Sequence, residues 1–208
     1  HVEQALHESE VLHRTLFETA GDAILLMRGG RFIDCNQRAL TMYGCSREEI
    51  IGVGPHEFSP PLQPDGRPSG ESALEKINLA IAGSPQSFEW EHRRRDGTRF
   101  IAEVSLNRVE IDGRILLQAI VRDITDRRRA EDALRKSEAT LQSVFKAAPV
   151  GICIMQNRVF KSANRYWCER FGYPEESIIG KSTRMLYEND EEWSRVGNEL
   201  YAHLKENG

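Results

Sequence analysis

The chain has 208 residues and a formal net charge of −4, and charged residues make up 29% of it. This length suits one or two domains, and the negative net charge argues against a nucleic-acid-binding surface, which normally carries a basic stripe. No apolar run approaches the roughly 20 residues that cross a bilayer and no signal peptide is visible, so we expect a cytoplasmic chain with no membrane segment.

A helix and a hairpin are predicted at the start of the chain. Residues 1–18 have helical apolar spacing, with Leu6 and Leu16 on one face. Two short apolar strands follow on either side of the Gly29-Gly30 turn, which is typical of a hairpin.

Helix-capping signals come next. Asn36 stands at the N-cap position of a short helix that ends at Gly44, and Ser46 to Glu49 is a capping-box pattern that opens another. After a loop rich in proline and glycine, a longer helix is predicted to begin at Ser72. Its apolar face is formed by Leu74, Ile77 and Ile81.

Three strands are predicted at residues 87–95, 98–109 and 114–124, joined by Asp-Gly turns. The run Arg93 to Arg95 precedes one of these turns, so we interpret it as a hairpin flank rather than a phosphate-binding site. The order of elements predicts an α+β fold in which a five-stranded antiparallel sheet is flanked by helices.

The sequence repeats itself without a gap at an offset of 128 residues. Glu3 to Glu10 matches Glu131 to Glu138, and Asn36 falls on Asn164. A repeat of this length indicates two copies of one domain rather than a solenoid. The chain stops before the counterparts of the last three strands, so we expect an incomplete second copy whose hairpin has an unpaired edge.

A highly charged helix is predicted between the two copies. Its apolar residues follow the a/d spacing of a coiled coil, although Ser137 weakens this stripe. We therefore expect a homodimer whose seam contains Leu6, Leu16, Leu134 and Leu141. The preceding strand enters this helix through Asp123, Ile124 and Thr125 with no Gly or Pro between them, and we predict that these residues relay a signal.

Several of these features together resemble a PAS domain. They are the helix–strand–strand opening, Asn36 after the second strand, the stretch from Gly44 to Gly52, the Arg-Arg-Asp-Gly-Thr run and the closing Asp123-Ile124-Thr125. We accordingly divide the chain into a signalling helix (1–18), a complete PAS domain (19–125), a coiled-coil-like linker helix (126–147) and an incomplete second PAS domain (148–208).

The resemblance implies a cup-shaped domain that senses a ligand, redox state, light or a partner. It also implies an output domain downstream in the same protein, usually a histidine kinase or a cyclic-dinucleotide enzyme such as a diguanylate cyclase or phosphodiesterase. A second possibility is a ligand-free dimerisation scaffold.

Catalytic and cofactor motifs are not apparent in the sequence. The six histidines are scattered without nucleophile or metal-ligand spacing, and the four cysteines form no CxxC pair. The predicted long helix carries no histidine for heme, and Gly52 to His56 carries no cysteine for flavin photochemistry. We expect a non-catalytic module without metal, heme or flavin.

A cavity, if present, is predicted to be apolar and to suit a small apolar ligand, unless its own side chains fill it. Trp90 is interpreted as a packing residue, with stacking on a flat cofactor as the alternative. The predicted lining residues are Ile24, Leu26, Leu74, Ile77, Ile81, Trp90, Leu117, Ala119 and Val121.

Overall fold

The computed structural model describes residues 2–207, and the side chains of residues 3–199. It contains two compact units, His1–Ala130 and Glu131–Gly208, and each is described by itself. Within residues 2–207, no helix is both long enough and apolar enough to span a bilayer.

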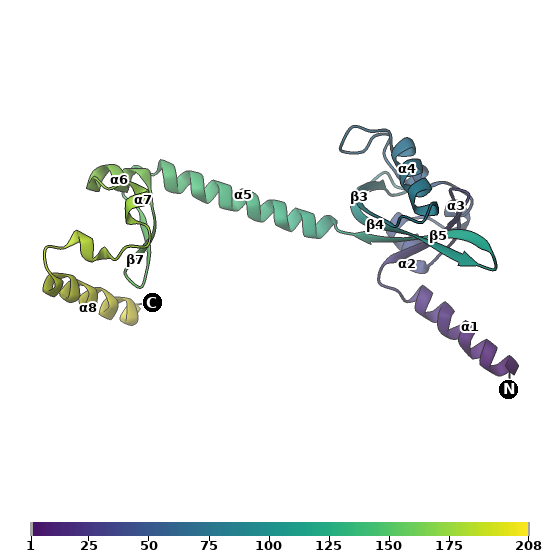
Figure 1. Ribbon diagram of the computed structural model, residues 1–208, viewed down its shortest axis with the longest axis horizontal. Helices are drawn as coiled ribbons and strands as arrows, with labels where there is room; N and C mark the ends of the chain where they lie inside the picture. The colour runs from purple at the N-terminus through teal and green to yellow at the C-terminus, as the bar shows by residue number, and fades with distance from the viewer. Residues whose placement is uncertain (1, 208) are drawn as a thin grey trace. The chain divides into compact units, whose positions relative to one another are not determined.

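The first unit contains the predicted five-stranded antiparallel sheet, with strand order β2-β1-β5-β4-β3 (Figure 1). The strands are β1 (Ala23–Arg28), β2 (Arg31–Cys35), β3 (Gln86–Arg93), β4 (Arg99–Ile111) and β5 (Arg114–Asp123). The helices are α1 (Val2–Glu18), α2 (Gln37–Tyr43), α3 (Arg47–Ile50), the 3-10 helix η1 (Pro55–Phe58) and α4 (Ser69–Ile81). Helix α5 (Thr125–Ala147) begins in this unit and continues into the second.

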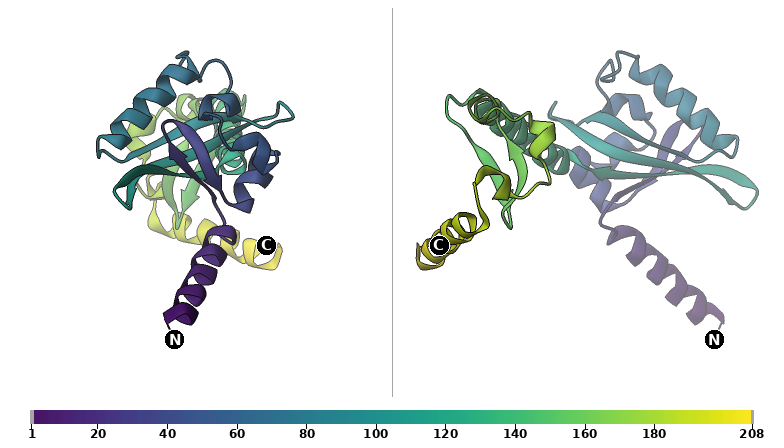
Figure 2. Two further views of the ribbon diagram at one scale, coloured as in Figure 1. Left: turned by 90° about the vertical axis from the view of Figure 1, so that its right-hand side faces the viewer. Right: turned by 60° about the vertical axis from the view of Figure 1, so that its left-hand side comes forward.

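One face of the sheet carries the core. Along β4, buried Phe100, Ala102, Val104 and Leu106 alternate with half-buried residues, as the sequence predicts. The segment between β2 and β3, which contains α2, α3, η1 and α4, packs against this inner face (Figure 2).

The predicted caps are confirmed, whereas the start of α4 is corrected. Gly44 ends α2 in the left-handed conformation at φ 66°, and the Glu49 carboxylate accepts a hydrogen bond from the Ser46 N–H at 2.9 Å in a capping box. Helix α4 begins at Ser69 rather than Ser72. It follows Pro68, whose fixed φ suits a helix start.

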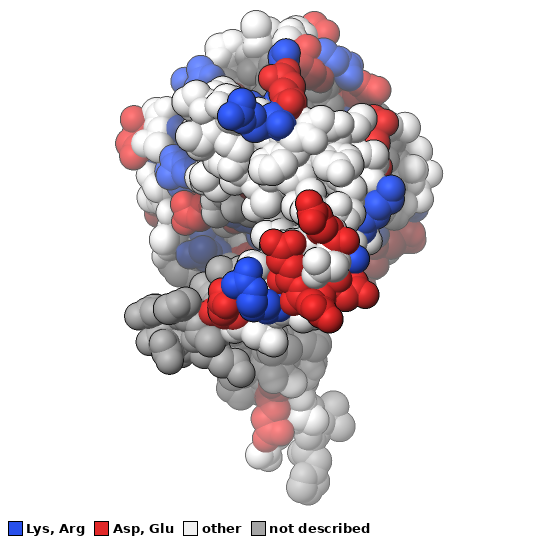
Figure 3. Space-filling view, turned by 90° about the vertical axis from the view of Figure 1, so that its left-hand side faces the viewer, with Lys and Arg blue, Asp and Glu red and all other residues white. Residues whose placement is uncertain are grey.

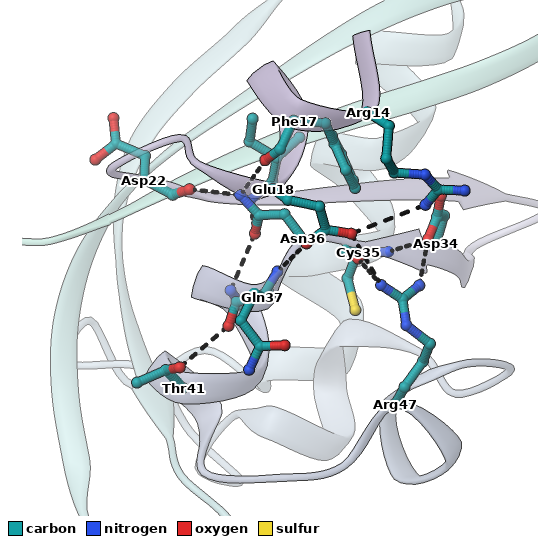
Figure 4. A network of polar contacts seen from close by, with 12 residues as sticks. Arg14, Phe17, Glu18, Asp22, Asp34, Cys35, Asn36, Gln37, Thr41 and Arg47 are labelled. Atoms are coloured by element: carbon teal, nitrogen blue, oxygen red, sulfur yellow. Dashed lines mark hydrogen bonds and ion pairs between the residues drawn. The ribbon is translucent and has the colours of Figure 1, made fainter. Parts of the chain in front are cut away.

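The side chain of Asn36 joins three elements of the first unit (Figure 4). Its oxygen accepts hydrogen bonds from the N–H groups of Ile24 in β1 and Ala39 in α2, both at 3.0 Å. Its amide nitrogen donates to the carbonyls of Phe17 in α1 and Asp22 before β1, also at 3.0 Å. Asn36 is fully buried, and these contacts satisfy its polar atoms.

The second unit repeats this arrangement at Asn164. The Asn164 oxygen accepts from the N–H groups of Ile152 and Trp167 at 3.0 and 2.9 Å. Its amide nitrogen donates to the carbonyls of Phe145 in α5 and Val150 at 3.0 and 2.8 Å. The internal repeat therefore extends from the sequence to individual hydrogen bonds.

The described part of the second unit holds a two-stranded sheet, β6 (Cys153–Gln156) and β7 (Val159–Ala163). Its helices are α6 (Arg165–Phe171), α7 (Glu175–Ile178), the 3-10 helix η2 (Thr183–Leu186) and α8 (Asp190–Asn207). The first turn of α8 carries three acidic residues, and acidic side chains gather on the face shown in Figure 3.

Burial differs between the two copies at equivalent positions. Tyr43 is 2% exposed because residues of β3 and β4 cover it, whereas its counterpart Phe171 is 53% exposed. Strand β1 pairs with both β2 and β5, but β6 pairs only with β7 among residues 2–207. Within the described residues, the second copy therefore leaves apolar side chains and a strand edge uncovered.

We expect Asn36→Ala to lower the free energy of unfolding of the first unit by about 2–4 kcal/mol. The substitution removes a helix cap and leaves two backbone N–H groups and two carbonyls without their partner. Urea denaturation measures this loss, with Asn107→Ala on the half-buried outer face of β4 as the control. If Asn36→Ala and Asn107→Ala unfold at the same urea concentration, the role assigned to Asn36 is contradicted.

Candidate functional site

The core of the first unit contains a partly open cavity of about 40 Å³. Its lining is almost entirely apolar and comes from the inner face of the sheet and from the segment between β2 and β3. A cavity needs about 10–15 Å³ of space for the centre of a water molecule in order to hold one water, so this cavity has room for very small molecules only. The lining residues are Leu25, Met27, Phe32, Tyr43, Pro55, Ala73, Ile77, Phe88, Trp90, His92, Val104, Leu106, Ala119 and Val121.

Four predicted lining residues, Ile77, Trp90, Ala119 and Val121, lie at this cavity. Leu117 points to the same core but does not line the cavity. The Trp90 indole N–H donates to the Ser59 hydroxyl at 3.0 Å. Both the ring and the polar atom of Trp90 are therefore accommodated by the protein itself, in agreement with its interpretation as a packing residue.

The prediction was wrong for Ile24 and Leu26, which lie half-buried on the outer face. Strand β1 is apolar at five consecutive positions, so its composition does not distinguish its two faces. The pairing with β5 determines which face of β1 points to the core, because it places Leu25 opposite Ala119 and therefore on the inner face.

The prediction was also wrong for Leu74 and Ile81. Leu74 is exposed, and Ile81 packs at the margin of the core without reaching the cavity. Helix α4 turns small residues toward the sheet, and its buried positions are Ser69, Ser72, Ile77 and Ala80. We predicted the inner face of α4 from its larger side chains, and this placed the face about one residue position away from the observed one.

A histidine that the sequence analysis did not single out lies in the cavity wall. His92 stacks on Phe100, with ring centroids 5.1 Å apart, and its Nδ1 lies 3.4 Å from the Tyr43 hydroxyl. Burial lowers the pKa of His92 to about 4, although the Asp123 carboxylate acts in the opposite direction. His92 is therefore neutral at pH 7. Its alternation with Phe88 and Trp90 along β3 is the sequence signal that could have identified it.

The junction of β5 and α5 is held by hydrogen bonds to two other segments. One Asp123 oxygen accepts from the Thr125 N–H at 2.9 Å and caps α5, while the other accepts from Arg94 at 2.7 Å. The Thr125 hydroxyl oxygen accepts from the Ile101 N–H of β4 at 3.0 Å. Ile124 between them is buried.

Arg94 connects this junction with α2. Its guanidinium donates to the Met42 carbonyl and lies 4.2 Å from the centre of the Phe100 ring. Burial disfavours the charged form of Asp123, but the hydrogen bonds from Thr125 and Arg94 outweigh burial and lower the pKa of Asp123. Two of the three predicted relay residues, Asp123 and Thr125, thus belong to one polar network, and Ile124 is buried between them. The sequence analysis did not assign Arg94 to this network.

The four predicted seam residues are solvent-exposed in the described chain. Leu6, Leu16, Leu134 and Leu141 are each at least 60% exposed, and α5 buries none of its residues. Helices α1 and α5 therefore carry apolar side chains that no other part of the described chain covers.

The PAS domain family matches residues 21–126, and a second PAS domain match covers residues 139–203. Because the first match alone covers half of the chain, the chain belongs to the PAS domain family. The crystal structure of the PAS domain of an HTR-like protein from Haloarcula marismortui is similar, with a TM-score of 0.51 at 28% identity, and the match covers 59% of this chain and 97% of that one.

Several relatives are named as sensors, and two of them match most of this chain. The methyl sulfide methyltransferase-associated sensor of Methanosarcina acetivorans is 30% identical over 144 residues, which are 68% of this chain and 14% of that sensor. Sensor protein FixL of Bradyrhizobium diazoefficiens is 26% identical over 155 residues, which are 74% of this chain and 30% of FixL. The chain spans less than a third of either relative, and it is a sensory signalling module of a kind that is generally non-catalytic.

We expect His92 to make the first unit less stable as the pH falls from about 6.5 to 4. The unfolded chain binds a proton near pH 6.5, whereas folded His92 binds one only near pH 4. Stability from this group is complete above pH 6.5 and falls by about 1.4 kcal/mol for each pH unit below it.

Urea denaturation at several pH values measures this slope. The variant His92→Leu should flatten it, whereas His56→Gln, at a histidine whose side chain is 57% exposed, should leave it unchanged. The same slope in wild type and His92→Leu would show that His92 is not held neutral by the fold.

Proposed function

We propose that the chain is a tandem PAS sensory module that relays a conformational change in its first domain to an output domain downstream in the same protein. A histidine kinase is the output we favour, and a diguanylate cyclase or phosphodiesterase is the alternative. The observation that carries the proposal is the direct, hydrogen-bonded passage from β5 into α5 at Asp123, Ile124 and Thr125.

The junction is suited to transmission because its hydrogen bonds couple α5 to the sheet. The Asp123 carboxylate is shared between the α5 start and Arg94, and Thr125 bonds to the neighbouring strand β4. The buried residues Ala119 and Val121 lie on the same strand, β5, and line the cavity. A change in cavity packing therefore acts on a strand whose next residues begin the helix.

The small cavity supports a module without heme or flavin. Ligand pockets usually measure about 300–1,000 Å³, which is far more than the 40 Å³ found here. We propose that the core is either filled by its own side chains or takes a small apolar ligand. If its own side chains fill the core, the chain acts as a ligand-free dimerisation scaffold.

We further propose that the chain forms a parallel homodimer through α1 and α5. The exposed seam residues support this proposal, since an apolar stripe on a charged helix is typical of a coiled coil.

Leu134→Asp with Leu141→Asp should convert the dimer to a monomer, because an unpaired charge in a buried seam costs several kcal/mol. The matched control, Ala139→Asp with Ser143→Asp, adds two negative charges on the other side of α5 and should leave the dimer intact. Sedimentation equilibrium distinguishes them. If both double variants sediment as wild type does, α5 is not the interface.

Asp123→Ala with Thr125→Ala should leave the first domain folded but uncouple the output of the full-length protein from its stimulus. Losing a helix cap costs about 1 kcal/mol, and a bias of this size changes the populations of a two-state switch several-fold. The control is Asp126→Ala with Thr140→Ala, two positions on α5 that do not hold it to the sheet.

The measurement is output activity of the full-length protein with and without stimulus, alongside thermal unfolding. An unchanged activity ratio in the folded double variant would show that the junction is a passive spacer, and the relay proposal would then fail.

A further inference from the structure

A second concave site lies at the surface of the first unit, beside the β3–β4 turn. It has a volume of about 160 Å³ and is lined by Glu57, Phe58, Arg93, Arg94, Arg95 and Gly97. The lining thus contains three arginines and one glutamate, although the chain as a whole carries a net charge of −4. The site is distinct from the apolar core cavity, which is lined by other residues.

The three arginines differ in how far they are already engaged. Arg94 is held by Asp123, Met42 and the Phe100 ring. Arg95 lies 3.2 Å from Glu49 in an exposed ion pair, which contributes little energy. In the described part of the chain, Arg93 has no carboxylate within salt-bridge distance, and its one hydrogen bond is a 3.5 Å contact with the Glu57 carbonyl.

Three backbone N–H groups of the turn are already engaged within the protein. The N–H groups of Arg94, Arg95 and Gly97 donate to the carbonyls of Thr98, Tyr43 and Arg94 at 2.8–3.0 Å. Recognition at this site therefore depends on side chains, and the guanidinium fork is the group that best matches the oxygens of a phosphate.

The sequence alone led us to interpret Arg93 to Arg95 as a hairpin flank rather than a phosphate-binding site, but the structure places them in a concave site with Glu57 and Phe58. We propose that this site binds a small oxyanion, namely a phosphate group, either free or as a monoester. Its volume is about four times that of the core cavity, which leaves room for one tetrahedral anion. A nucleic acid fits poorly, because binding an extended polyanion requires many basic contacts along a surface, whereas here Glu57 and Glu49 border the basic cluster.

Binding at this site would reach the β5–α5 junction through Arg94. An oxyanion attracts the guanidinium that also donates to Asp123, so the two acceptors compete for Arg94. By linkage, any effect of the anion on the junction is matched by an equal effect of the junction on anion affinity. The site goes beyond the relay proposed above, since binding can be measured whether or not the relay operates.

The test is a titration of the 208-residue chain with inorganic phosphate at constant ionic strength, followed by backbone amide NMR. We expect saturable shifts at Arg93 to Gly97 and a smaller shift at Thr125. Sulfate and phosphoserine serve as parallel titrants. Tighter binding of phosphoserine than of phosphate assigns the site to a monoester, and the reverse assigns it to a free oxyanion.

Matched variants distinguish specific binding at this site from nonspecific attraction to positive surface charge. Arg93→Gln with Arg95→Gln should weaken phosphate binding at least tenfold, because charge-assisted hydrogen bonds are lost. Arg99→Gln with Arg108→Gln removes the same charge from positions that pair with Glu91 and Glu110 outside the site, and should change affinity less than twofold.

The reverse change gives a second, independent readout. Glu57→Gln removes the one carboxylate of the site and should tighten phosphate binding several-fold, whereas Glu110→Gln should not. Shifts that stay linear up to high phosphate concentration, or equal losses in the two double-arginine variants, would overturn the proposal.

Discussion

The buried asparagine amide is the interaction on which each unit depends. A strand, a helix and an incoming helix converge at Asn36, and each brings a backbone group that a helix end or strand start leaves unpaired. No apolar side chain could occupy this position without stranding those groups in the core. The same four contacts recur at Asn164, so the amide determines how the preceding helix attaches to the domain in both copies.

The charged residues around this shared amide differ between the copies. In the first unit, the Glu18 carboxylate accepts from the Gln37 N–H at 2.8 Å and lies 3.6 Å from Arg47. The equivalents of Glu18 and Arg47 are Lys146 and Glu175, so the charges are reversed. Exposed ion pairs contribute little to stability, which allows them to change while the buried amide is retained.

The two ends of the first domain use the same physical solution. At its entry, the Asn36 amide donates to the last turn of α1. At its exit, Asp123 accepts from the first N–H of α5, and the Thr125 hydroxyl of that helix accepts from β4. Both attachments satisfy helix-terminal backbone groups with short polar side chains rather than apolar packing. A helix held in this way leaves its own apolar stripe uncovered, as the exposure of the α5 leucines shows.

Local chemistry made much of the fold predictable from the sequence. The capping residues, the Asp-Gly turns and the alternation of β4 each depend on neighbouring residues alone, and they led to the five-stranded sheet and its order of elements. The inner face of β1 depended instead on its pairing with β5, because an apolar strand carries no alternation of its own. The inner face of α4 depended on how closely the helix approaches the sheet, which favours its small residues.

Arg94 and His92 likewise acquire their partners, Asp123 and Tyr43, only when segments 29 and 49 residues apart are brought together. Such contacts are decided by tertiary packing, because neither residue type nor local spacing specifies a distant partner.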